Sequence, residues 1–466
     1  MSNKQHPETI ARPQVSPAPR KRALGPVTSR RAGYIVFASL VAPILLLVES
    51  IRTGSRQYRH WLLTAFVTMY GATIFIRYDP TGEGSDGVRH LLLVYEHYVG
   101  MSFGQFLEDC YYILTFQEAS SRGIKDLYKH IISYISGGIL GAPQTFFVFV
   151  AFIYGYFFVG CFLEFFRHIQ WRKLNYVVFS FVALLFLVKN IEGINTVRTW
   201  TGLWILMYAC LRYYDTKNSK YILLMLVPPL IHFGYFLMLL PALAVLIFGN
   251  QVKIYAAIFI LSSFTTFINP GDIVDVVEST GERGEAAVSS YLVEERRTFQ
   301  ERAEWALNLE GRWYRDFRFL GVQKWALNVL IYTLLAAGVY FSLMSYRQRS
   351  LFSVGLMTLA FSNMTWFLFA VSARSWIIGC IFILASFVMA RTDPETAPRL
   401  IRSVPAFYTW GLHLSLLLFV PFFLYNLSTI MDYISVFMFV APFLVWFNPE
   451  INMSIKYVLQ VLLGIR

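Results

Sequence analysis

Long apolar stretches alternate with short polar segments along most of the chain. A membrane-spanning helix needs roughly 20 predominantly apolar residues, and fewer where short or tilted segments are tolerated. By this criterion the sequence predicts thirteen spans, at residues 34–50, 61–77, 143–166, 174–190, 197–214, 219–232, 233–248, 254–268, 323–345, 350–371, 374–391, 404–425 and 430–447. We therefore expect an all-α polytopic integral membrane protein with about thirteen (12–14) transmembrane helices.

The segment "LLMLVPPLIHFGYFLMLLPAL" is too long for one helix, and Pro228 and Pro229 interrupt it. Its length suits two short helices. Interrupted helices occur at membrane depth only where protein or water covers the freed backbone groups. This region is therefore a candidate cavity wall.

Three polar regions flank or interrupt the apolar pattern. Residues 1–33, rich in Pro, Ser and bases, predict a disordered basic tail, and residues 34–466 form one predicted membrane domain. Residues 77–143 carry many acids and the helix-like pattern "FGQFLEDCYYILTF". Residues 269–323 contain "AAVSSYLVEERRTFQERAEWALNL", whose apolar spacing predicts an amphipathic helix on the membrane or over a cavity. No small-residue cleavage site stands behind the first apolar run, so we expect that helix to be retained.

Bases in alternate short loops predict the orientation, because cytoplasmic loops carry an excess of Lys and Arg. These bases are Arg52, Arg56, Arg59, Arg167, Arg172, Lys173, Arg212, Lys217, Lys220, Lys253, Arg347, Arg349, Arg391, Arg399 and Arg402. With thirteen spans, the two long segments 77–143 and 269–323 and the loop before Arg198 then lie outside. The basic tail disagrees: either it is translocated against its charge, or one span near it is miscounted.

Composition agrees with a membrane protein. Of the 466 residues, 56% are hydrophobic and 15% are charged, and the mean hydropathy is +0.51. The net charge of +12 is spread through short loops. We therefore interpret it as charge that orients the spans and attracts lipid headgroups, not as a sign of nucleic-acid binding. The four cysteines show no disulfide framework or metal-ligand spacing. Phosphate-binding Gly-rich loops and nucleophile elbows are missing too, so we expect no metal and no cofactor.

Ionisable residues inside or at the ends of apolar spans are costly and are functional candidates by default. Arg198 and Arg374 each open a span on the predicted outer side, and His232 stands beside the two prolines. An arginine at a helix end can also be a snorkelling anchor, and a lone histidine on an apolar face is more often structural. Two arginines placed alike favour one anionic site, since a guanidinium can hold two phosphate oxygens together.

Other charged residues near these positions are weaker candidates. Glu192 lies close to Arg198, and Asp86 lies in the first outer segment; either is a candidate acid or base, although their spacing shows no tight pair. The cluster "EGRWYRDFRF", which contains Arg315, fits either a headgroup anchor or a lid that touches an anionic substrate.

The block "INTVRTWTGLWILMYACLRYYDTKNSKYILLMLVPPLIHFGYFLMLLPAL" resembles bacterial polysaccharide polymerases of the EpsG and Wzy type. In that family an arginine motif begins a span, a short basic loop follows, and a second span ends in a histidine near the outer surface. Arg198 and His232 stand at these positions. Weaker similarity covers "GEGSDGVRHLLLVYEHY", with Asp86 near the family's outer-face aspartate, and "SARSWIIGCIFILA", with Arg374 at a later span-opening arginine.

Two residues depart from the family pattern. Family members typically have a glutamine after the first arginine and a tyrosine after the aspartate, whereas this chain has Thr199 and Gly87. The departure at Gly87 makes Asp86 the least secure of the matched positions.

The resemblance implies a GT-C-like glycosyltransferase that crosses the bacterial inner membrane many times. Such a polymerase joins undecaprenyl-diphosphate-linked oligosaccharide repeat units at the outer face, without metal or nucleotide sugar. The expected partners are the lipid-linked glycan, membrane lipids, a chain-length regulator and a flippase. His232 is expected to act as the base, with Glu192 or Asp86 behind it, while Arg198, Arg374 and Arg315 are expected to bind the diphosphate.

Other classes of membrane protein share parts of this pattern. An O-antigen ligase would use the same arginine-lined diphosphate site, and an acyltransferase is a further transferase. A flippase or transporter would explain many spans, but it predicts repeat symmetry and polar residues spread through the membrane centre. A nonenzymatic assembly subunit predicts fewer charged groups at the cavity.

Overall fold

The computed structural model describes residues 29–76, 86–115, 126–171, 174–264, 317–366 and 369–464. Within these ranges every regular element is helical, and Ser435 and Ser454 form an isolated antiparallel bridge. The predicted all-α class is therefore confirmed for the described residues. Most of the predicted tail and of the segment 269–323, including Arg315 and the amphipathic helix, lies outside them.

The first part of the chain forms short and long helices in turn. In chain order they are α1 (Ser29–Val41), α2 (Ile44–Arg52), α3 (Arg56–Thr73), α4 (Asp86–His97), α5 (Phe103–Thr115), α6 (Leu127–Ser133), the π-helix η1 (Tyr134–Ile139), the 3-10 helix η2 (Pro143–Thr145), α7 (Phe146–Phe165), α8 (Tyr176–Val188), the 3-10 helix η4 (Ile191–Thr196) and α9 (Thr199–Thr216).

The second part continues with helices of the same two kinds. They are α10 (Lys220–Met225), α11 (Pro228–Ile231), α12 (Tyr235–Met238), α13 (Leu240–Phe248), α14 (Val252–Ser262), α18 (Phe317–Ala336), α19 (Val339–Ser342), α20 (Tyr346–Met364), α21 (Phe369–Thr392), α22 (Thr396–Ser403), α23 (Ala406–Tyr433), η6 (Val436–Met438), α24 (Phe443–Phe447), η7 (Pro449–Ile451) and α25 (Ile455–Leu462).

Four helical stretches among the described residues are long and apolar enough to cross a membrane. They are Pro143–Phe165, Tyr176–Thr196, Val371–Thr392 and Ala406–Tyr433. Three shorter apolar stretches, Lys220–Ile231, Tyr235–Phe248 and Val252–Ser262, add to them. These apolar helices are consistent with a helical membrane protein, while the total of thirteen spans stays a prediction.

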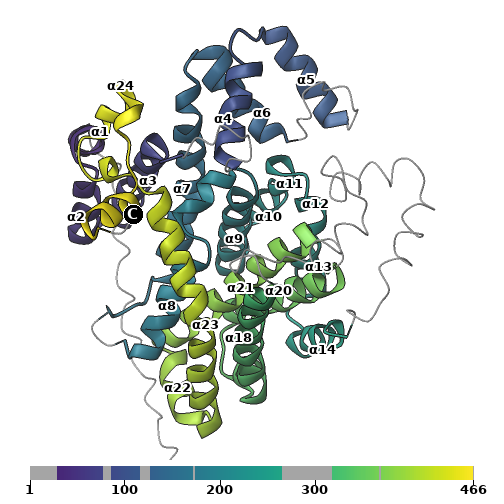
Figure 1. Ribbon diagram of the computed structural model, residues 1–466. Helices are drawn as coiled ribbons and strands as arrows, with labels where there is room; N and C mark the ends of the chain where they lie inside the picture. The colour runs from purple at the N-terminus through teal and green to yellow at the C-terminus, as the bar shows by residue number, and fades with distance from the viewer. Residues whose placement is uncertain are drawn as a thin grey trace, which may run out of the picture.

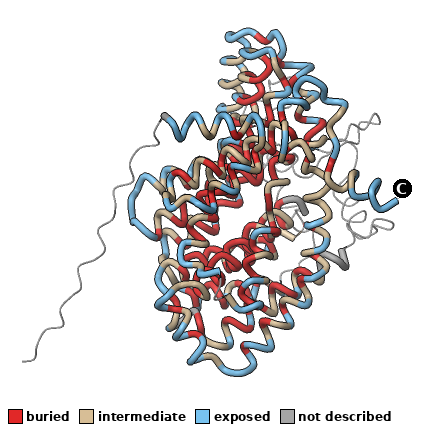
Figure 2. Tube along the Cα trace, turned by 90° about the vertical axis from the view of Figure 1, so that its left-hand side faces the viewer, coloured by how far each residue is buried: buried red, intermediate tan, exposed pale blue. Residues whose placement is uncertain are grey.

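The long helices pack side by side around one buried core. α20 lies against α21, α3 against α7, α7 against α9, and α18 against α23. Figure 2 shows buried residues along the inner faces of these helices and exposed ones along the outer faces. Small residues allow close helix approach in membranes. At Gly71 of α3, a Cβ would lie 2.2 Å from the carbonyl oxygen of Phe147 in α7, so this contact needs glycine.

The predicted spans 34–50 and 430–447 are not continuous helices in the structure. The predicted span 34–50 is divided into α1 and α2, and the break falls just before Ile44, where Pro43 precedes the first turn of α2. The prediction of a continuous helix over 430–447 is wrong. There α23 ends at Tyr433, and Ala441, with a φ of 55°, and Pro442 precede only the short α24.

The proline-interrupted region is more broken than the sequence indicates. Four short helices, α10 to α13, replace the two that were expected, and His232 lies in the break between α11 and α12. The interruption itself is confirmed. The first outer segment supplies α4, α5 and α6, which lie together at one end of the molecule, whereas α22 lies at the other end (Figure 1). The helix expected at "FGQFLEDCYYILTF" is confirmed as α5.

Candidate functional site

Asp126 is the centre of a buried polar cluster at the end of the molecule that holds α4, α5 and α6. It precedes α6 directly, at the position where an aspartate usually accepts a hydrogen bond from the first turn, yet its side chain makes no such bond. Its carboxylate instead turns to other elements, and the side chain is only 1% exposed. A buried carboxylate needs charged or polar partners, and here two other segments provide them.

Arg198 provides the first partner, from the residue before α9. Its guanidinium Nη1 forms an ion pair and hydrogen bond with Oδ2 of Asp126. The turn that presents Arg198 is strained, because Val197 has a φ of 52°, a conformation that is rare for a β-branched residue. Val197 is fully buried, and its carbonyl accepts a hydrogen bond of 2.6 Å from the hydroxyl of Thr201. Such strain persists only where the surroundings impose it, and it clusters at functional sites.

The break between α11 and α12 provides the next two partners. Oδ1 of Asp126 accepts hydrogen bonds from the backbone N–H of Phe233, at 2.8 Å, and from Nδ1 of His232, at 3.3 Å. The interruption that Pro228 and Pro229 introduce therefore has a structural role. It frees a backbone donor and turns the histidine toward the carboxylate.

Arg374, in the second turn of α21, completes the chain of contacts. Its Nη1 lies 3.1 Å from Nε2 of His232. A guanidinium can only donate, so Nε2 acts as the acceptor and the ring proton lies on Nδ1, where it is donated to Asp126. The geometry thus assigns a neutral histidine with its lone pair directed toward Arg374.

Side chains from α4 and α6 add charge around this core. Burial, and then the charge of Arg198, lower the pKa of Lys129 to about 8, while Asp126 and Asp86 act against that shift. Burial and the charges of Lys129 and Arg198 also lower the pKa of His90. His90 and Lys129 therefore titrate under the influence of the same charges as Asp126, and they belong to the cluster.

The hydrogen bonds and the ion pair of Asp126 together affect its pKa more than its burial does. Burial alone would raise the pKa of this carboxyl, but the hydrogen bond with His232 and the charge of Arg198 hold the pKa below its usual range. Asp126 is therefore ionised at neutral pH. Against its single negative charge stand Arg198, Arg374 and Lys129, so the cluster carries an excess of positive charge that suits an anion with more than one charge.

Asp86 lies at the edge of this cluster. It is the first residue of α4 and its side chain is exposed. The next residue, Gly87, explains the approach of α4: a Cβ there would lie 2.1 Å from Oδ1 of Asn195, in the 3-10 helix that leads to Arg198. The departure from the family's tyrosine at this position thus fits a close contact between two segments of the site.

Glu192 belongs to a neighbouring group instead. Its carboxylate pairs with Lys189 at 3.2 Å, and Lys189 also lies 4.7 Å from the ring centre of Trp200. The described contacts of Glu192 include neither Arg198 nor His232. Of the six predicted site residues, the structure brings Arg198, His232 and Arg374 together, places Asp86 at the edge and Glu192 beside them, and does not describe Arg315.

Asp126 is the residue of this candidate site that the sequence did not predict. It is one of several acids in residues 77–143, and its position before a helical pattern looks like an ordinary helix cap. The signal that could have singled it out is the run of apolar residues after it, which predicts burial for the start of α6.

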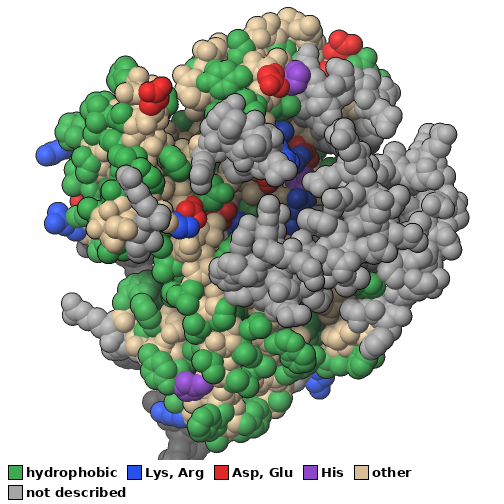
Figure 3. Space-filling view, in the orientation of Figure 1, with side chains coloured by type: hydrophobic (Ala, Val, Ile, Leu, Met, Phe, Trp, Pro, Cys, Tyr) green, Lys and Arg blue, Asp and Glu red, His purple; other side chains and the backbone are tan. Residues whose placement is uncertain are grey.

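Figure 3 shows Lys, Arg, Asp, Glu and His side chains close together in the upper half of one face. Most of the remaining described surface on this face is hydrophobic or uncharged. Among the described residues, no three His, Cys, Asp or Glu side chains form a group that could hold a metal ion.

Comparisons with protein-family models, with curated proteins and with solved structures found no match to this chain.

Proposed function

We propose that the chain is a polymerase that joins undecaprenyl-diphosphate-linked oligosaccharide repeat units at the outer face of a bacterial inner membrane. The observation that carries this proposal is the contact chain from Arg198 through Asp126 and His232 to Arg374. It joins, in one buried cluster, the residues that the family resemblance assigns to diphosphate binding and to proton transfer.

The cations fit the leaving group of such a reaction. When the glycan leaves its lipid diphosphate, negative charge develops on the phosphate oxygens, and preorganised cations stabilise that charge most where water is excluded. Arg198 and Arg374 provide two planar guanidinium groups, and Lys129 provides a further positive charge. Asp126 holds Arg198 in place before the substrate arrives, so little reorganisation is needed.

His232 fits the role of general base. The hydrogen bond from Nδ1 to Asp126 fixes the tautomer, which leaves the lone pair on Nε2 to accept a proton. When Arg374 turns from Nε2 to the diphosphate, Nε2 takes the proton of the acceptor hydroxyl. The acceptor oxygen then forms a bond to the anomeric carbon of the growing glycan, and the bond from that carbon to the diphosphate breaks. The lipid diphosphate leaves with the electron pair, and His232 later releases its proton to water.

The distribution of charge favours a transferase over a flippase. A transporter is expected to place polar groups through the membrane centre, on both sides of the substrate path. In the described residues the Asp126 cluster lies beside α4 to α6, and the other buried charge cluster, around Glu164, joins residues of the predicted cytoplasmic side, so the sequence assigns neither to the membrane centre. A ligase would use the same chemistry with a different acceptor, so the acceptor decides between the two.

Deletion of the gene, followed by electrophoresis of the surface polysaccharide, tests the proposal. Loss of the polymerase leaves single repeat units attached to the carrier or to the lipid core. Long free polymer that stays unattached would identify a ligase, and repeat units trapped at the cytoplasmic face would identify a flippase. Either of these two results would overturn the polymerase assignment.

A further inference from the structure

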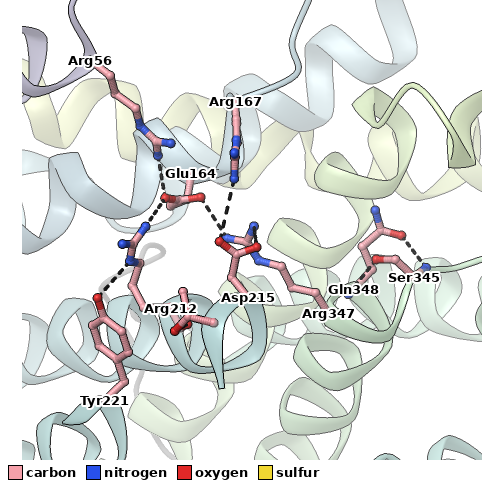
Figure 4. Close-up of polar contacts among 10 residues, drawn as sticks. Arg56, Glu164, Arg167, Arg212, Asp215, Tyr221, Ser345, Arg347 and Gln348 are labelled. Carbon is pink, nitrogen blue, oxygen red and sulfur yellow. Dashed lines mark hydrogen bonds and ion pairs between the residues drawn. The ribbon is translucent and has the colours of Figure 1, made fainter. Parts of the chain in front are cut away.

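A second buried charge cluster lies away from the candidate site and is built from the predicted cytoplasmic loops. Its centre is Glu164, near the end of α7, whose side chain is 2% exposed. Three arginines converge on this carboxylate: Arg56 at 2.6 Å, Arg212 at 3.1 Å and Arg347 at 3.1 Å. Figure 4 shows them approaching Glu164 from different helices.

Positive charge is in excess in this second cluster. Asp215 is the second acid, and it pairs with Arg347 at 3.6 Å and with Arg167 at 3.8 Å. Four arginines therefore face two carboxylates. Both oxygens of Glu164 already accept from arginines, so the cluster offers no free carboxylate to a cation, and its excess charge favours an anion.

A pocket opens beside this cluster. Its volume is about 80 Å³, and about 10–15 Å³ suffices for one water, so there is room for a group of several heavy atoms. Glu164 itself lines it, with both carboxylate oxygens paired to arginines, and the other polar residues that line it include Arg347, His168, Ser345, Gln348 and Thr392. Asp393 lines it too, but its carboxylate is engaged by the backbone N–H and the hydroxyl of Thr396.

Arg347 links the pocket to the cluster. It lines the pocket, its side chain is 14% exposed, and it contacts both carboxylates through its terminal nitrogens. Its Nε is buried and has no hydrogen-bond partner among the described residues. Buried donors almost always have a partner. The exposed part of this guanidinium lines the pocket and can donate to an acceptor there, and the N-terminal end of α20, where Arg347 lies, adds a favourable dipole.

We propose that this pocket binds a phosphate group, from either free phosphate or an anionic lipid headgroup. Phosphate matches the site because its oxygens can accept from Arg347, from the hydroxyl of Ser345 and from His168, and because its charge balances the excess of arginine. The two sources share this chemistry. The proposal is independent of the polymerase assignment, since it uses different residues.

The test uses the full-length protein in an uncharged detergent and follows the thermal unfolding midpoint. One series adds inorganic phosphate against chloride at equal ionic strength, and the other adds dioctanoyl phosphatidylglycerol against dioctanoyl phosphatidylcholine. A rise with phosphate identifies the free anion, and a rise with phosphatidylglycerol alone identifies a headgroup. No rise in either series overturns the proposal.

Variants locate the binding. Arg347→Gln is expected to weaken it at least about tenfold, the effect of losing one charge-assisted hydrogen bond. The matched control is Arg52→Gln, because Arg52 is an exposed arginine of α2 that belongs neither to the Glu164 cluster nor to the pocket lining, and it is expected to change the affinity by less than about twofold. Arg374→Gln changes only the first cluster. If the rise in the unfolding midpoint is lost in Arg374→Gln but kept in Arg347→Gln, the anion binds at the first cluster. That result would overturn the proposal.

If Arg347→Gln does not fold, the variant His168→Asn tests whether phosphate binds in the pocket. His168 is exposed and lines the pocket, so its replacement is expected to preserve the fold while weakening binding about threefold, the effect of one ordinary hydrogen bond. Unchanged affinity in this variant contradicts the proposal.

Discussion

At the scale of single residues, the candidate site depends on what arginine can do and lysine cannot. Arg198 pairs with the buried carboxylate of Asp126, and Arg374 donates to Nε2 of His232. Both are planar groups with several fixed donors, which a flexible ammonium does not reproduce. The same residues therefore fit both the resting contacts and a diphosphate.

Arg198→Lys and Arg374→Lys are expected to leave the protein in the membrane at normal levels and to lower polymer synthesis about tenfold or more. Each variant keeps its charge but loses the two-point contact with phosphate oxygens, and one preorganised donor commonly contributes that much to the rate. The measurement is the chain-length ladder of the surface polysaccharide, together with membrane levels. Arg52→Lys, the same change at an exposed arginine in α2, is the control. Normal chain lengths from either variant would remove that arginine from the mechanism.

The lowered pKa of Lys129 predicts that activity changes with pH on the alkaline side. Its pKa is lowered to about 8, so its positive charge is present below that pH and is lost as the pH rises through it. Asp126 stays ionised throughout this range, and His90 has its lowered pKa on the acid side. We therefore expect kcat/KM for the lipid-linked donor to fall as the pH rises above about 8, because this ratio reports the free enzyme.

The variant Lys129→Arg tests whether Lys129 causes this decline of kcat/KM at alkaline pH, because a guanidinium stays charged at every accessible pH. The decline above about pH 8 should move to higher pH in the variant, measured in membrane vesicles with Lys253→Arg as the matched substitution elsewhere. A decline that stays in place would be assigned to another group.

At the scale of elements, the site is built where regular helices stop. Arg198 follows a strained turn after η4, His232 lies between α11 and α12, and Asp126 lies just before α6. At each of these points the chain leaves one helix before the next begins, so a side chain can be directed inward at a helix end. Close packing of these ends then holds them together, as Gly87 does against Asn195.

Gly87→Ala is expected to lower both stability and activity, because its Cβ would lie 2.1 Å from Oδ1 of Asn195. Overpacking of this kind typically costs about 1–3 kcal/mol. Asn195→Ala should restore part of the loss in the double variant, since Oδ1 of Asn195 is buried without a hydrogen-bond partner among the described residues. Thermal unfolding and polymer synthesis are measured for all three variants. Gly104→Ala in α5 is the control, because open space surrounds that glycine; equal losses in both positions would contradict the packing argument.

At the scale of the whole molecule, the two charge clusters separate according to the side that the sequence predicts. Arg198, Arg374 and Asp126 come from predicted outer positions, whereas Arg56, Arg167, Arg212 and Arg347 come from predicted cytoplasmic loops and meet around Glu164 and Asp215. No ion pair in the described residues joins one set to the other. This separation agrees with a membrane between the clusters.

Cysteine labelling tests the predicted orientation. In a Cys110→Ser background, in which the other three native cysteines are buried, Ser102→Cys reports the outer segment and Asn218→Cys reports the loop after α9. A membrane-impermeant maleimide should label Ser102→Cys in spheroplasts, and Asn218→Cys only after permeabilisation, because the two positions lie on opposite sides of the bilayer. The reverse labelling pattern would show that the orientation is opposite to the predicted one. Labelling of both positions in spheroplasts would contradict their placement on opposite sides of the bilayer.

Local properties of the sequence determined the helical class, most helix positions, the interruption at Pro228 and three residues of the candidate site. Hydropathy, proline and the cost of a charge at a span end act over a few residues, so they can be read without a fold. They also gave a wrong prediction at 430–447, where apolar composition predicts a span but α23 ends at Tyr433 and only the short α24 follows after Ala441 and Pro442.

Only the tertiary structure decided what those residues contact. Asp126 lies 72 residues from Arg198 and 106 from His232, and Arg374 lies 142 residues from His232. Contacts over such separations depend on how helices pack, which no local pattern specifies. For the same physical reason Asp126, an ordinary helix cap by sequence, became the centre of the site, while Glu192, close to Arg198 along the chain, turned to Lys189 instead.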